Sequence, residues 1–226
     1  MGTAAVEKTF FLTSIGKKYV MGLTGLIWAG FVAGHMAGNM LMFVGPDAYN
    51  SYGHALTSGY LIYAIETLLI LALATHIACA VSLTLENRRA RGGQRYAVTP
   101  NGTKAPRFAS QTMAIQGSII LVFIILHIAT FKYGTYYETT ANGVVMRDLH
   151  RLLVEVFHNP GYVAWYLVAM VFLFMHLSHG VGSIFQSFGI KNQKNEHMIR
   201  VISFVYGAVV AGGFFAQPIY CFVWGQ

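Results

Sequence analysis

The chain has 226 residues, of which 55% are hydrophobic and only 10% are charged. Soluble domains carry about 25% charged residues, so this composition excludes a soluble enzyme and predicts one membrane domain over residues 1–226. The net charge of +7 does not predict nucleic-acid binding, because the basic residues lie between apolar stretches, where membrane topology accounts for them.

Five apolar stretches are each long enough to cross a bilayer as a helix. They lie at about 19–43, 60–85, 108–132, 161–188 and 199–223. Lys and Arg residues number 12 on one side of these spans and 3 on the other. The positive-inside rule predicts an all-α bundle of five transmembrane helices, with a cytoplasmic N-terminus and an outside C-terminus, in the inner (cytoplasmic) membrane. No small-residue cleavage site follows the basic N-terminal residues, so we expect the first span to remain as a membrane helix.

The first span carries Gly30, Gly34 and Gly38, which form a stripe of small residues along one helix face. Such a stripe is typical of close packing between membrane helices. It would also make a smooth wall for a flat macrocycle beside His35, and the two interpretations are compatible.

The third connection contains apolar residues at helical spacing between Asn142 and Asn159. This pattern predicts a helix near 142–158 that lies in the outer membrane interface. We interpret His150 and His158 as polar residues of that interface, with a ligand role as the alternative, and we expect His197 to be solvated. His54, in the first connection, has the same two interpretations.

The motifs of nucleotide-binding and hydrolytic sites do not occur in the chain. Cys79 and Cys221 both lie in apolar stretches, without a C-x-x-C motif. This placement indicates two small apolar core residues rather than a disulfide framework, a zinc site or covalently attached haem.

One histidine lies deep in each of the first four spans: His35, His76, His127 and His176. An ionisable side chain at that depth is costly and indicates a functional site. Counting from the cytoplasmic basic residues gives depths of about 18 Å for His76 and about 22 Å for His176. The same count gives about 26 Å for His35 and about 30 Å for His127. The ordering predicts two pairs, His76 with His176 and His35 with His127.

Two histidines at one level on facing helices suit the axial ligation of a planar tetrapyrrole, which needs one ligand on each face. A hydrogen-bonded core histidine is the alternative for any one of them. His179 competes with His176, since it lies three positions on and about 60° around the helix. We expect His176 to be the ligand and His179 to be a candidate contact for a haem propionate.

Three segments of the chain are similar to a known family: SIGKKYVMGLTGLIWAGFVAGHMAGN, DAYNSYGHAL and FMHLSHGVGSIFQSFGI. With five spans and a histidine in each of the first four, the chain resembles the dihaem cytochrome b membrane anchor of succinate:quinone oxidoreductases and fumarate reductases. The resemblance implies two haem b groups, with His76 and His176 as the axial ligands of one and His35 and His127 as the ligands of the other. The family's fourth ligand lies thirteen residues before the Gly that closes the helix, and counting back from Gly189 gives His176.

The resemblance further implies electron transfer between an extrinsic iron–sulfur subunit and membrane quinone, with menaquinone favoured. A flavoprotein and an iron–sulfur protein on the cytoplasmic side would carry the dicarboxylate chemistry, and the chain itself would contact lipid and quinone. Some fumarate reductases of this type carry a Glu where this chain has Phe174, and the family's acid after the first connection is missing from residues 56–58. Glu66 is the only acid inside a span. It is therefore our candidate quinone-site residue, with a protonated carboxyl bonded to a backbone carbonyl as the alternative.

Two other classes of protein use membrane histidines. Membrane di-metal oxygenases carry several H-x-x-H or H-x-x-x-H motifs near the membrane interface. Here only His176 and His179 have this spacing, and they lie deep in the membrane. A transporter with a histidine proton relay needs broken helices and acids, and this sequence has few acids in its spans.

Overall fold

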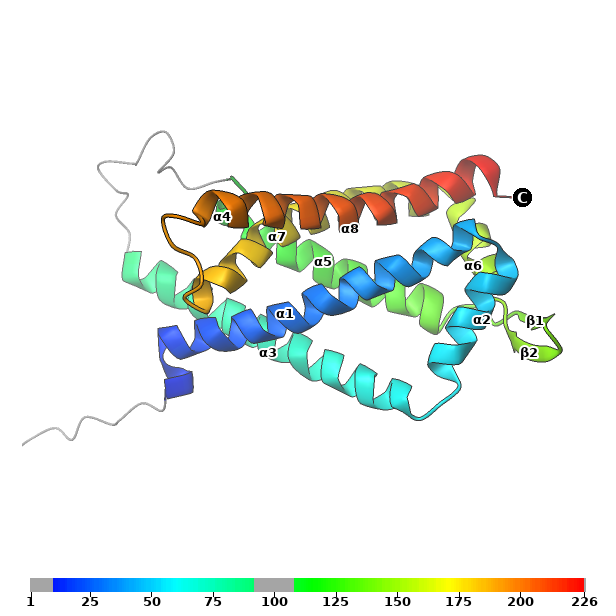
Figure 1. The fold of residues 1–226 in the computed structure, drawn as a ribbon, viewed down its shortest axis with the longest axis horizontal. Helices are drawn as coiled ribbons and strands as arrows, with labels where there is room; N and C mark the ends of the chain where they lie inside the picture. Colours follow the sequence, from blue (N-terminus) through cyan, green and yellow to red (C-terminus); the bar gives the residue numbers. More distant parts are fainter. Residues whose placement is uncertain (1–9, 92–107, 226) are drawn as a thin grey trace, which may run out of the picture.

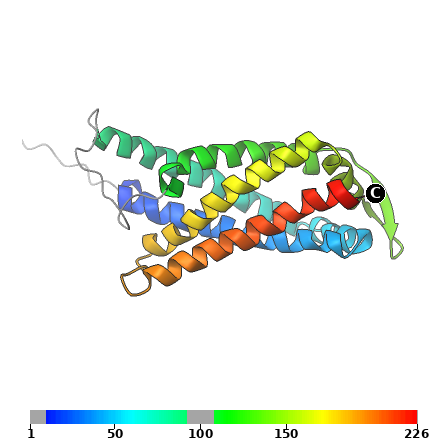
Figure 2. The ribbon, with the colours of Figure 1, turned by 90° about the horizontal axis from the view of Figure 1, so that it is seen from above.

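The computed structural model describes residues 10–91 and 108–225 of the chain. Five long helices pack side by side as a bundle, which Figure 1 and Figure 2 show from two directions. They are α1 (Ser14–Asn39), α3 (Leu61–Arg91), α5 (Met113–His127), α7 (Pro160–Ser187) and α8 (Glu196–Trp224). With the short turns that extend two of them, all five are long and apolar enough to cross a membrane. The prediction of five spans is therefore confirmed, and the chain is a multi-pass membrane protein.

Capping residues set the helix ends, which differ from the predicted spans by a few residues. α1 begins at Ser14 because the Thr13 hydroxyl accepts a hydrogen bond of 3.1 Å from the Gly16 N–H. At the start of α7, the Asn159 side chain accepts a hydrogen bond of 2.8 Å from the Gly161 N–H. Each cap satisfies a backbone donor that has no partner within its own helix.

The two ends of the bundle are built differently. One end holds the start of α1 and the connection between α7 and α8, and the other holds the C-terminus and three short elements (Figure 1). These elements are α2 (Pro46–Thr57), a β-hairpin and α6 (Leu149–Phe157), and a single helical turn, α4 (Phe108–Gln111), precedes α5. Helix α2 lies within residues 44–59, which were predicted only as a connection. This helix begins with Pro46 directly after Gly45, whose φ of 142° suits glycine.

The predicted helix near 142–158 is wrong over its first half. Residues there form a hairpin of β1 (Glu138–Ala141) and β2 (Val144–Arg147), in which Glu138 faces Arg147. Asn142 and Gly143 connect the strands with φ values of 52° and 77°. An Asn-Gly pair adopts two such positive φ values readily and favours a two-residue hairpin. Only α6, from Leu149 to Phe157, is helical.

A buried asparagine fastens α2 to the start of α6. The side chain of Asn50 is 1% exposed and donates a hydrogen bond of 2.8 Å to Asp148. Its oxygen accepts a hydrogen bond of 2.9 Å from the backbone N–H of His150. Asp148 is also the N-cap of α6, where its carboxylate accepts a bond of 3.0 Å from the Arg151 N–H. The short helices at this end therefore form one hydrogen-bonded unit.

Helix α5 ends in a π-helical turn. Residues Ile128–Lys132, labelled η4, are π-helical, and the Tyr133 N–H donates a bond of 3.2 Å to the Ile128 carbonyl five residues earlier. This turn aims Lys132 at Glu66 on α3, with which it forms an ion pair. Beside it lies the most buried hydrophobic cluster of the described residues: Met42, Leu153, Phe157, Tyr166 and Cys221.

Candidate functional site

The four span histidines meet in two pairs. The ring centroids of His76 and His176 lie 6.5 Å apart, and those of His35 and His127 lie 5.8 Å apart. The four come from α1, α3, α5 and α7, one from each helix. We call His76 and His176 the near pair, since they lie toward the end where α1 begins, and His35 and His127 the far pair. These are the pairs that the depth estimate grouped.

The two pairs occupy separate layers of the bundle. On α5, Gly117 lies beside the near pair, where an added Cβ would be 3.8 Å from the His176 ring, and His127 of the far pair follows ten residues later. On α7, Tyr166 contacts His127, and His176 of the near pair follows ten residues later. Ten residues of helix rise about 15 Å, so this is the separation of the layers along the bundle.

A buried threonine orients His76 in the near pair. The Thr24 hydroxyl donates to the backbone carbonyls of Val20 and Met21, at 2.9 and 3.1 Å. Its oxygen lies 3.1 Å from His76 Nδ1 and therefore accepts the hydrogen bond from that nitrogen. With the proton held on Nδ1, the lone pair of Nε2 is free to bind a metal.

His176 is held differently from His76. Its Nδ1 is buried, and it has no hydrogen-bond partner among the residues that the structure describes. Leaving such an atom unpaired costs about 1–3 kcal/mol, and this ring lacks a hydrogen bond like the one that fixes the tautomer of His76. Glycines make room on both sides, since an added Cβ at Gly25 would lie 3.4 Å from the His76 ring and one at Gly117 would lie 3.8 Å from the His176 ring.

The far pair has hydroxyl and amide neighbours. His127 Nδ1 lies 3.2 Å from the Tyr166 hydroxyl, which can hold the proton on that nitrogen. His35 Nδ1 lies 3.4 Å from Asn39 Nδ2, a long contact, because this amide donates to the His35 carbonyl at 2.8 Å. The Tyr49 hydroxyl holds the amide in place by donating a bond of 2.8 Å to Asn39 Oδ1.

Aromatic rings pack against both histidines of the far pair. Phe31 stacks on His35 at a centroid distance of 5.4 Å, and Phe123 stacks on His127 at 5.6 Å. Phe131 lies 5.3 Å from the His127 ring and Phe214 lies 5.8 Å from the His35 ring. Because the surroundings are apolar, a charged imidazole would be costly here and the neutral, metal-binding form is favoured.

The spacing of each pair is compatible with one metal between two imidazoles. Metal–nitrogen bonds of about 2 Å on opposite sides of one ion put the ring centroids about 6 Å apart. Among the described residues, no group of three or more His, Cys, Asp or Glu side chains gathers as a metal site. Two protein ligands suffice for a haem, whose macrocycle supplies the other four, so the residues present fit this group.

The glycines of the α1 stripe have different surroundings. An added Cβ at Gly38 would collide with the ring of Tyr52 on α2, so this glycine allows close packing. At Gly30 and Gly34, an added Cβ would meet nothing that the structure describes within 4 Å. Close packing therefore accounts for Gly38 alone, and a wall beside a macrocycle remains a prediction for Gly30 and Gly34.

Neither His179 nor Glu66 belongs to a ring pair. His179 Nε2 lies 3.1 Å from the Ser183 hydroxyl, and the side chain lines a cavity with Arg200. Glu66 forms its ion pair with Lys132, so the structure places an ammonium group, rather than the backbone carbonyl of our alternative interpretation, next to its carboxylate.

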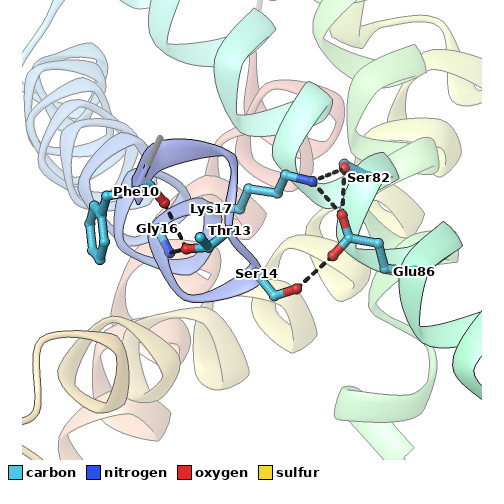
Figure 3. Close-up of polar contacts among 7 residues, drawn as sticks. All are labelled: Phe10, Thr13, Ser14, Gly16, Lys17, Ser82 and Glu86. Atoms are coloured by element: carbon cyan, nitrogen blue, oxygen red, sulfur yellow. Dashed lines mark hydrogen bonds and ion pairs between the residues drawn. The ribbon is translucent and has the colours of Figure 1, made fainter. Parts of the chain in front are cut away.

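A polar network joins α1 to α3 at the end of the bundle that holds the near pair (Figure 3). The Lys17 ammonium donates to Ser82 at 2.8 Å and forms an ion pair with Glu86, which also accepts a bond of 2.8 Å from Ser14. Lys17 lies two turns before Thr24 on α1, so the network fixes the helix pair that carries the bond between Thr24 and His76. In the sequence, Lys17 was interpreted only as one of the charges that set the membrane topology.

Sequence reasoning also missed the residues that orient the imidazoles, Thr24 and Tyr166. The sequence contained a signal for Tyr166. It lies ten residues before His176 on the same span, and ten residues of helix is the separation of the two histidine layers, so Tyr166 lies level with the far pair.

Neither a protein-family model, nor a curated protein, nor a solved structure matches this chain.

Proposed function

We propose that this chain is the haem b-bearing membrane anchor of a succinate dehydrogenase or fumarate reductase complex, reacting with membrane quinone. The observation that carries the proposal is the meeting of four histidines from four helices as two ring pairs, at 6.5 and 5.8 Å. The two layers, about 15 Å apart, match the number of haem groups that the sequence resemblance implies.

In this proposal, each histidine pair holds one haem b, which supplies one-electron transfer when bound. The chain's own residues position the ligands. Thr24 keeps the proton of His76 on Nδ1, at 3.1 Å, and Tyr166 lies 3.2 Å from Nδ1 of His127. Both contacts leave the opposite ring nitrogen available for the metal and raise the basicity of the imidazole.

The soluble chemistry belongs to partners in this proposal. The sequence has only two cysteines, too few for an iron–sulfur cluster held by four thiolates, and it lacks a dinucleotide-binding motif. We therefore assign the dicarboxylate reaction to a flavoprotein subunit and the electron supply to an iron–sulfur subunit. Both would dock on the cytoplasmic side of the inner membrane, where the basic connections and the N-terminus lie in our topology, with the C-terminus outside.

The proposed quinone site lies at the far end of the bundle, and menaquinone is the favoured quinone. Glu66 is its candidate residue, because quinone reduction needs hydrogen-bond donors and a route for protons. Its ion pair with Lys132 gives the site a donor and an acceptor on neighbouring helices. His179 remains the candidate propionate contact.

Haem content tests the proposal directly. We expect a pyridine haemochrome assay on the purified chain to give two haem b per polypeptide, and reduced-minus-oxidised spectra to show bis-histidine haem. The variant His176→Ala should lose one haem and keep the other. His179→Ala, one turn away on the same helix, is the matched control and should keep both.

Other results would redirect the assignment. One haem or none per chain would reject the proposal and return the histidines to a metal oxygenase or a proton relay. Loss of one haem in His179→Ala, with both retained in His176→Ala, would exchange the roles of the two residues.

A further inference from the structure

A cavity with both polar and apolar walls opens between α4, α7 and α8 at the end of the bundle where α8 begins. It has a volume of about 320 Å³ and is lined by Ala109, Ser178, His179, Arg200, Val201 and Phe204. Arg200 is the one permanent cation among these lining residues, and none of them is acidic. Glu196, one turn earlier on α8, forms an ion pair with Lys191 at 3.1 Å. The cavity therefore suits an anionic group.

An apolar groove continues from this cavity toward the middle of the membrane. It has a volume of about 270 Å³ and is lined by Val171, Phe174, Phe204, Ala208, Ala211, Gly212 and Phe215. Phe204 belongs to both hollows, and its ring packs edge-on against Phe174 at a centroid distance of 5.3 Å. The two hollows therefore share this ring and lie one after the other along α7 and α8, with the polar side chains in the first and apolar side chains in the second. We call the two hollows together the path.

The length of this path matches one leaflet of a bilayer. From Arg200 to Gly212, α8 rises about 18 Å, and half of a hydrocarbon core is about 15 Å. The two helices stay close along the path because an added Cβ at Gly207 would lie 3.1 Å from the Phe174 carbonyl. A molecule in the path therefore lies on the surface of the helix pair, with its polar group at the level of the membrane interface.

We propose that this path binds one anionic phospholipid, with its phosphate at Arg200 and one acyl chain along the apolar groove. The guanidinium group pairs with phosphate through two parallel hydrogen bonds, and Ser178 and His179 offer further polar atoms beside it. A quinone would also fit an apolar groove, but its neutral ring gains little from a permanent cation, so the charge favours the lipid.

Native mass spectrometry of the purified chain in detergent tests this proposal, with dioleoylphosphatidylglycerol as the probe. We expect one retained lipid per chain, and Arg200→Gln should weaken its apparent affinity about tenfold or more, with Arg200→Lys in between. Lys194→Gln removes the same charge from the same end, outside the lining, and should bind lipid as the unchanged chain does.

A second variant tests the acyl groove without touching the cation. Gly212→Leu should also weaken binding. It should fold, because an added Cβ at Gly212 meets no atom within 4 Å among the residues that the structure describes. Val209→Phe adds bulk to an exposed position of α8 outside the groove and should leave binding unchanged.

Several outcomes would overturn the lipid assignment. Equal loss in Arg200→Gln and Lys194→Gln would show a general charge effect, and equal loss in Gly212→Leu and Val209→Phe would show general damage to α8. Displacement of the lipid by inorganic phosphate alone would indicate an anion site without an acyl chain. Displacement by a menaquinone analogue would assign the groove to quinone. Haem loss in Arg200→Gln with the lipid retained would assign the cavity to a haem propionate. Lipid binding does not depend on the proposed haem, so the two proposals can fail separately.

Discussion

The hydrogen bond between Thr24 and His76 gives a sharp prediction about the near pair. Thr24→Val keeps the shape of the side chain but removes the oxygen that accepts from His76 Nδ1, at 3.1 Å. Thr24 is only 6% exposed, so water does not readily replace the lost acceptor. The hydrogen bond raises the basicity of the imidazole and thereby stabilises the oxidised iron of our proposal. We therefore expect the midpoint potential of one haem to rise.

The size of this shift follows from the energy of one hydrogen bond. A net contribution of about 0.5–1.5 kcal/mol, acting on the oxidised state, corresponds to a rise of about 20–60 mV for a one-electron couple. The other haem lies in a layer about 15 Å away and should keep its potential. The change should leave haem content at two per chain, because the ligands remain in place.

A redox titration monitored by visible spectroscopy, on the purified chain, measures both potentials. Thr24→Ser is the matched control, since it keeps the hydroxyl and should leave both potentials unchanged. If neither potential rises in Thr24→Val, or if Thr24→Ser produces the same rise, the hydrogen bond does not orient a haem ligand and our reading of the near pair is refuted.

Three further predictions concern packing, pH and the quinone site. Gly38→Ala should destabilise the chain by about 1–3 kcal/mol, because the new methyl group overpacks against an aromatic ring, and thermal unfolding in detergent measures this. Burial lowers the pKa of His150 below its ordinary value of 6.5, although the Asp148 carboxylate opposes this shift. Protonation therefore favours the unfolded state, and stability should fall as the pH drops through 6.5 toward the lowered pKa, an effect that His150→Gln removes from unfolding curves. Glu66→Gln should keep both haem spectra and slow quinone turnover by about tenfold or more, while succinate oxidation with an artificial acceptor continues.

Each of these has a matched control. Gly59→Ala, in the turn between α2 and α3, meets no described atom within 4 Å of its new methyl group and should not lower stability. His158→Gln changes a histidine in the same region, whose Nδ1 lies 2.8 Å from the Val154 carbonyl, and tests whether the pH effect belongs to His150. Lys132→Met removes the partner of Glu66. Unchanged quinone turnover in Glu66→Gln would make this carboxylate structural, and unchanged spectra with slow turnover in both variants would assign the effect to the ion pair.

The spans and the histidine pairs were predictable because each depends on one strong signal. Hydropathy over 20 or more residues locates a membrane helix, since every backbone polar group must be satisfied inside the bilayer. Depth along a helix rises by a fixed amount per residue, so counting from basic residues placed His76 with His176 and His35 with His127.

The short elements were harder to predict because two signals overlapped in them. The apolar spacing after Asn142 is helical, yet the Asn-Gly pair favours a turn, and the turn prevails since Gly143 readily takes its φ of 77°. The orienting residues follow no pattern of their own. Thr24 and Tyr166 are ordinary helix residues in sequence, and only the packing of α1 against α3 and of α5 against α7 brings them to an imidazole.

The wide turn at Ile128–Lys132 has an evolutionary consequence. A π-helical turn contains one residue more than the α-helical turn it replaces, so every later residue is rotated by about 100° from where an unbroken helix would put it. That rotation is what allows Lys132 to meet Glu66. The turn is thus geometrically equivalent to one extra residue in an unbroken α-helix. A relative in which α5 continues without the π-helical turn will show a one-residue gap between His127 and Tyr133 when the two sequences are aligned. Such a relative will also need another partner for Glu66.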